Sequence, residues 1–120
     1  RMLELDRTAI SFLKNPLHAA YRLKTSVLDV GAQIASLTDT LRHNVPAPWS
    51  LYGEVYVYEP VAHVTSDRWF VFEMHGTPPE AKTYPAESDV LTQAIHSALG
   101  LSEDATLECL GVWQMPSAAP

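Results

Sequence analysis

A stretch rich in aromatic and β-branched residues in the middle of the chain indicates a β-sheet. The segments 51–60 (LYGEVYVYEP) and 68–76 (RWFVFEMHG) place such residues at alternate positions, and the polar residues Thr65, Ser66 and Asp67 precede the second segment. A period of two is typical of strands. Two such runs separated by a polar turn predict an antiparallel β-hairpin.

Neither face of the first hairpin strand is simply polar. One face carries Tyr52, Tyr56 and Tyr58. The other face is aliphatic and carries Leu51, Gly53, Val55 and Val57. We expect the chain's own helices to cover one face, and the tyrosine-rich face to be a ligand pocket or a partner surface.

A long helix is predicted before the hairpin. Residues 17–43 contain no proline, and their apolar residues recur at spacings of three and four, as in an amphipathic helix. These residues are Ala20, Leu23, Val27, Val30, Ile34, Leu37 and Leu41. The wide stripe favours packing on the chain's own sheet, and the alternative is pairing with a second copy. In this register Ile34→Asp should destabilise the fold severely, whereas Asp29→Ala should do little.

Three further elements are expected. Residues 2–13 form either a short strand or a helix capped by Asp6, and we favour the helix. A second helix begins near Ser88 and ends at Gly100, which takes the left-handed position after the last turn. The segment 106–115 (TLECLGVWQM) is a strand.

The predicted fold class is therefore α+β. Residues 1–115 make one domain, with an antiparallel sheet built from the hairpin and the C-terminal strand and covered on one face by one long and one short helix. A flexible tail is expected at 116–120. If residues 2–5 form a strand, the order becomes β-α-β-β-α-β, the split βαβ arrangement.

Composition argues against a membrane-spanning or disulfide-linked protein. The sequence has no run of about 18 apolar residues, which is the length that a transmembrane helix requires. Its single cysteine, Cys109, excludes an internal disulfide and sits in an apolar run, as a buried thiol would. A reducing cytoplasm is the expected location.

Charge is distributed unevenly along the chain. The net charge is −6, yet residues 1–45 hold six of the eight lysines and arginines, and residues 46–120 hold ten of the 14 acidic residues. An acidic sheet with few cations is a poor phosphate binder, so nucleic acid is not an expected partner. A basic protein partner would complement the acidic excess.

Motifs for common chemistries are absent from the sequence. The five glycines are scattered singly, which disfavours a phosphate-binding loop, and no Gly-x-Ser-x-Gly turn occurs. Five histidines raise a metal hypothesis, but none has a close partner at the spacing of a zinc site. We expect neither a cofactor nor a metal.

Glu54 is the one candidate for acid/base catalysis. It lies between Tyr52 and Tyr56, and a covered carboxylate in such a setting would have a raised pKa. The simpler interpretation is an exposed glutamate, or one paired with Arg68 across the hairpin.

Tryptophans supply the remaining candidate site residues. Trp69 and Trp113 are of a type found more often in cores than in ligand platforms. Trp49 follows Pro46-Ala47-Pro48, and a tryptophan in such a connector often joins one element to another or to a partner.

Two classes of function remain after this survey. The favoured one is a non-enzymatic protein-interaction domain, a homodimer or an adaptor, chaperone or inhibitor, that binds another chain through its aromatic sheet face or its helix stripe. Its interface residues would be Tyr52, Tyr56, Tyr58, Trp49 and Trp69. The alternative is a small-molecule-binding protein or enzyme with a pocket between helix and sheet that includes Tyr52, Tyr56, Trp69 and His75 and uses Glu54 as acid/base.

Overall fold

The computed structural model describes residues 16–27, 29–58, 67–77 and 84–114. Within them lie four strands and two helices in the order β-α-β-β-α-β: β1 (Leu17–Ser26), α2 (Val30–Asn44), β2 (Trp49–Tyr58), β3 (Asp67–Gly76), α3 (Tyr84–Leu99) and β4 (Thr106–Gln114). The predicted element at 2–13, the turn residues Thr65 and Ser66, and the tail at 116–120 lie outside the described residues.

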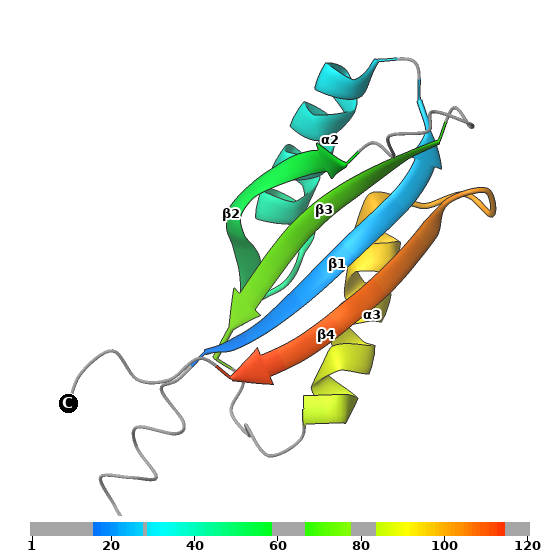
Figure 1. The fold of residues 1–120 in the computed structure, drawn as a ribbon. Helices are drawn as coiled ribbons and strands as arrows, with labels where there is room; N and C mark the ends of the chain where they lie inside the picture. Colours follow the sequence, from blue (N-terminus) through cyan, green and yellow to red (C-terminus); the bar gives the residue numbers. More distant parts are fainter. Residues whose placement is uncertain (1–15, 28, 59–66, 78–83, 115–120) are drawn as a thin grey trace, which may run out of the picture.

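The four strands form one antiparallel sheet in the order β2-β3-β1-β4. Both helices lie behind this sheet, α2 across β2 and α3 across β4, and nothing described covers the front (Figure 1). The α+β fold is therefore confirmed, and its order is that of the split βαβ arrangement. Neither helix in the described part of the chain is long and apolar enough to cross a membrane.

The long helix predicted at 17–43 is wrong in its first half. Residues 17–26 form β1, the strand that lies between β3 and β4. In β1 the alternate residues Leu17, Ala19, Tyr21 and Leu23 face the helices and are buried. The same segment fits a helical period through Ala20 and Leu23, so local spacing did not distinguish the two structures. Residues 17–26 form a strand because they pair with β3 along one edge and with β4 along the other.

The second half of the predicted helix is correct and forms α2. Its stripe is confirmed at Leu37 and Leu41, which are buried, while Ile34 is partly buried against the core. Asp29 does not lie on a polar helix face as predicted. It is the N-cap residue, and its Oδ1 accepts a hydrogen bond of 3.0 Å from the Ala32 backbone N–H.

The predicted hairpin strands are confirmed as β2 and β3. Their register is regular on either side of an irregularity between Tyr52 and Tyr56, where β2 has more residues than β3 opposite them. Gly53 lies in this bulge with a φ of 75°, a left-handed conformation that glycine adopts without steric cost. The bulge changes the direction of the β2 side chains at its centre.

The second predicted helix and the last strand are confirmed with shifted ends. α3 begins at Tyr84, before the predicted cap, and ends before Gly100, whose φ of 58° is the expected left-handed value. Leu91 and Ile95 are buried as predicted, whereas Val90 is 60% exposed. The two helices have 15 and 16 residues, because β1 takes the first part of the predicted long helix.

The core lies between the sheet and the two helices. Its largest fully buried side chains include Tyr21, Phe70 and Phe72, and the rings of Tyr21 and Phe72 stack with their centroids 5.6 Å apart. The Tyr21 hydroxyl and the Thr92 hydroxyl of α3 share a hydrogen bond of 2.7 Å. Burial raises the pKa of Tyr21, so the phenol stays neutral and links the central strand to α3.

The N-cap of α2 can be tested by substitution at Asp29. Asp29→Ala removes the acceptor for the Ala32 N–H and should lower the free energy of unfolding by about 1 kcal/mol. Asp29→Asn keeps a side-chain oxygen and should preserve most of the stability. Urea denaturation of the three proteins measures the difference. Equal stability of Asp29→Ala and the wild type would contradict the capping role.

Candidate functional site

The uncovered side of the sheet is the candidate site. Alternate residues of all four strands point there, and the strand registers bring them into cross-strand rows. We define the open face as His18, Arg22 and Lys24 of β1, Tyr52, Tyr56 and Tyr58 of β2, Trp69, Glu73 and His75 of β3, and Glu108 and Trp113 of β4.

Three tyrosines form the β2 edge of the open face. Tyr52, Tyr56 and Tyr58 are 49%, 55% and 60% exposed, so each presents about half of its surface to solvent. The sequence assigned these three side chains to one face, and the structure places them together there. Their rings are large apolar surfaces with a polar hydroxyl end, a combination that suits a partly wet interface.

An aromatic cluster occupies one end of the open face. His18 lies directly across from His75 on β3 and from Trp113 on β4. The ring of His18 stacks with Trp113 at a centroid distance of 5.8 Å and meets His75 edge-on at 5.6 Å. Tyr52 contacts both histidines, at 4.9 Å from His18 and 5.3 Å from His75. These neighbours bury His18, which is only 4% exposed.

The other end of the open face combines a tryptophan with two cations. The Arg22 guanidinium lies 4.4 Å from the centre of the Trp69 ring, and the Lys24 ammonium lies 5.6 Å from it, both within reach of a cation–π interaction. Arg22 also donates from Nη2 and Nε to Oε2 of Glu108 at 2.7 and 2.8 Å. Charges of both signs are therefore held in fixed positions on the sheet.

These cations correct the expectation of an acidic sheet. Because β1 belongs to the sheet, Arg22 and Lys24 lie at its centre instead of on a separate helix. The open face thus carries two cations beside the acidic Glu73 and Glu108. The sheet is therefore not purely acidic, and an acidic sheet was the reason for not expecting nucleic acid as a partner. The two carboxylates would still repel phosphates.

Trp49 lies away from the other predicted interface residues. It is the first residue of β2, faces the helix side and is only 5% exposed. A methyl group added at Gly76 would come within 2.9 Å of the Trp49 ring, so the ring rests directly on the β3 backbone. Trp49 joins the start of β2 to the end of β3, and the open face keeps Tyr52, Tyr56, Tyr58 and Trp69.

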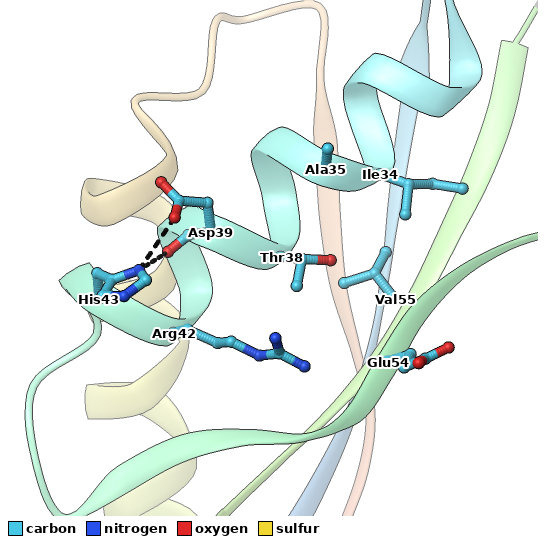
Figure 2. Close-up of a pocket in the computed structure, with 8 residues that line it drawn as sticks. All are labelled: Ile34, Ala35, Thr38, Asp39, Arg42, His43, Glu54 and Val55. Atoms are coloured by element: carbon cyan, nitrogen blue, oxygen red, sulfur yellow. Dashed lines mark hydrogen bonds and ion pairs between the residues drawn. The ribbon is translucent and has the colours of Figure 1, made fainter.

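Glu54 also lies outside the open face. The bulge takes it out of the alternation, and its exposed side chain lines a groove between β2 and α2 (Figure 2). Arg68, its predicted partner across the hairpin, instead lies opposite Thr25 near the end of β1. A helix–sheet groove thus exists, but Tyr52, Tyr56, Trp69 and His75 are not among the residues that line it.

The pair of His18 and His75 escaped the sequence analysis, which looked for histidines close in sequence. In a strand at 17–26, His18, Ala20, Arg22 and Lys24 share one face. This alternation would have predicted that His18 lies on the open side of the sheet. Within the described residues, no three histidine, cysteine or acidic side chains come together to hold a metal ion.

Comparison of the sequence with known proteins assigns the chain to no family. No protein-family model and no curated protein sequence matches the chain.

The buried histidine makes stability depend on pH. Burial, and next the nearby His75, lower the pKa of His18 from its usual 6.5, while Glu73 opposes the shift. His18 then binds a proton less readily in the folded than in the unfolded chain, so stability falls as pH drops below about 6.5. The free energy of unfolding should be smaller at about pH 5 than at about pH 7.5.

Two variants isolate the contribution of His18. His18→Phe keeps an aromatic ring but removes the titrating group, so the loss of stability between the two pH values should shrink. His96→Gln alters an exposed histidine of α3 and serves as the matched control. Urea denaturation at both pH values gives the comparison. A pH dependence unchanged in His18→Phe would assign the effect to another group.

Proposed function

We propose that this chain is a protein-interaction domain whose open face binds the open face of a second copy, giving a homodimer. The observation that carries the proposal is the set of aromatic side chains exposed on the side that neither helix covers. Tyr52, Tyr56 and Tyr58 are joined there by Trp113, which is 38% exposed. Exposed aromatic surfaces of this kind mark interaction sites more often than they mark ordinary surface.

The size of the open face supports a stable interface. Four strands about 4.8 Å apart and about ten residues long give a face of roughly 600 Å² before the relief of the side chains is added. Each partner of a typical stable complex buries about 800 Å². The whole sheet face is therefore close to one side of a standard interface.

The charges of the open face favour a second copy over an acidic or a basic partner. Arg22 and Lys24 lie on the same face as Glu73 and Glu108, so a twofold pairing can set each sign against the opposite one. A partner of one charge sign would meet like charges as well. The net charge of −6 belongs to the whole chain, and charges more than about 8 Å apart are largely screened at physiological salt.

Substitution of Tyr56 tests the interface. Tyr56 lies opposite Val71 in the middle of the tyrosine edge and is 55% exposed, so Tyr56→Ala should leave the fold intact. Because the loss of an aromatic anchor at the interface removes a large contact area, the substitution should weaken association by about 2 kcal/mol, or about thirtyfold in Kd. Sedimentation velocity over a concentration series measures the Kd.

Val90→Ala is the matched control for Tyr56→Ala. Val90 is an exposed apolar residue of α3, on the helix side of the sheet, and its loss should leave the dimer unchanged. A wild-type chain that is monomeric at high micromolar concentration would overturn the proposal. So would equal association of the two variants, or a monomer whose open face binds single-stranded RNA and loses that binding in Tyr56→Ala.

A further inference from the structure

The groove between α2 and β2 lies beside the bulge in the edge strand, since Glu54 and Val55 of the bulge are among its lining residues. Between Tyr52 and Tyr56 the register of β2 against β3 shifts, and Gly53 adopts a positive φ. The groove measures about 420 Å³, which lies within the usual range for small-molecule sites, about 300–1,000 Å³. Because the bulge interrupts the regular edge of β2, the site suits a compact ligand better than an added peptide strand.

The inner surface of the groove is apolar. This surface is formed by Ile34 of α2, which is partly buried, and Val55 of β2, which is only 4% exposed, whereas Ala35 lines the groove but is itself exposed. Figure 2 shows Ile34 of the helix and Val55 of the strand directed into the same space. An aliphatic group placed there would be removed from water against branched side chains.

A guanidinium at the groove can bind an anion. Arg42 extends from α2 toward β2 (Figure 2), and its described hydrogen bond is a long one of 3.5 Å to the Gly53 carbonyl oxygen. A guanidinium has five N–H donors and binds a carboxylate through two parallel hydrogen bonds. Most of this donor capacity is therefore not used by the Gly53 contact.

Two carboxylates line the groove, those of Asp39 and Glu54, and Glu54 is the one that can bind a cation. Asp39 is engaged by His43, whose Nδ1 lies 3.1 Å from Asp39 Oδ1 and 2.8 Å from the Asp39 carbonyl oxygen. Glu54 is exposed, and its carboxylate points away from Arg42 in Figure 2. Because Glu54 is exposed and directly precedes Val55, its side chain can change to another staggered rotamer without displacing a core residue.

We propose that this groove binds a free α-amino acid with an aliphatic side chain. Arg42 takes the carboxylate of the ligand, Glu54 takes its ammonium group, and Ile34 and Val55 contact the aliphatic side chain. A simple anion would lie beside Asp39 and Glu54, and a simple cation beside Arg42, so a ligand with both charges matches the groove best. The site is separate from the open face and goes beyond the proposed dimerisation.

Leucine and two of its fragments test the ligand class by isothermal titration calorimetry. 4-Methylpentanoate is leucine without the amino group, and 3-methylbutylamine is leucine without the carboxylate. Leucine should bind at least tenfold more tightly than either fragment, since each fragment leaves one protein charge without its partner. Equal affinity for leucine and 4-methylpentanoate would reduce the groove to an anion site and overturn the proposal, as would undetectable leucine binding to the folded protein.

Variants of the groove locate the binding. Arg42→Gln and Glu54→Gln alter exposed side chains, so both proteins should fold, and each should weaken leucine binding at least tenfold. Glu103→Gln removes an exposed carboxylate that does not line the groove and is the matched control. Leucine affinity unchanged in both charge variants would overturn the proposal. Tyr56→Ala should bind leucine like the wild type, so failure of the dimer and failure of this site give different results.

Discussion

The strand β1 pairs with both β3 and β4, and this pairing positions the core and the open face together. One set of alternate residues of β1, Leu17 to Leu23, lies under the two helices and is buried. The intervening set, His18 to Lys24, lies on the open face. The central strand therefore supplies both the middle of the core and the middle of the candidate interface, and a shift by one residue would exchange the two.

The core holds the sheet in place from one side only. Tyr21 joins β1 to α3 through its hydrogen bond to Thr92, and Trp49 joins β2 to β3 through the close approach at Gly76. With both helices on the same side, the aromatic and charged side chains of the front face have no described cover (Figure 1). An antiparallel sheet tolerates one wet face, but here that face carries aromatic side chains, as interfaces do.

The bulge in β2 lies between the open face and the groove, so this one strand contributes side chains to both surfaces. Outside the bulge, Tyr52, Tyr56 and Tyr58 keep to the open face, while inside it Glu54 lies beside α2. One edge strand therefore contributes to the proposed dimer interface and to the proposed ligand groove. The two surfaces use different side chains, so each can be removed by substitution without the other.

The hairpin strands and α3 were predictable because the pattern of each segment fits only one kind of secondary structure. Tyr56 and Tyr58 alternate with Val55 and Val57, as residues of a strand do, so the hairpin was predicted. Leu91 and Ile95 fall on one helical stripe before Gly100, so α3 was predicted. Residues 17–26 fit both periods, and only pairing with β3 and β4 made them a strand. The composition of the open face depends on this strand, because His18, Arg22 and Lys24 belong to it. Contacts such as His18 with His75 depend on strand register between distant segments, and local periodicity carries no information about register.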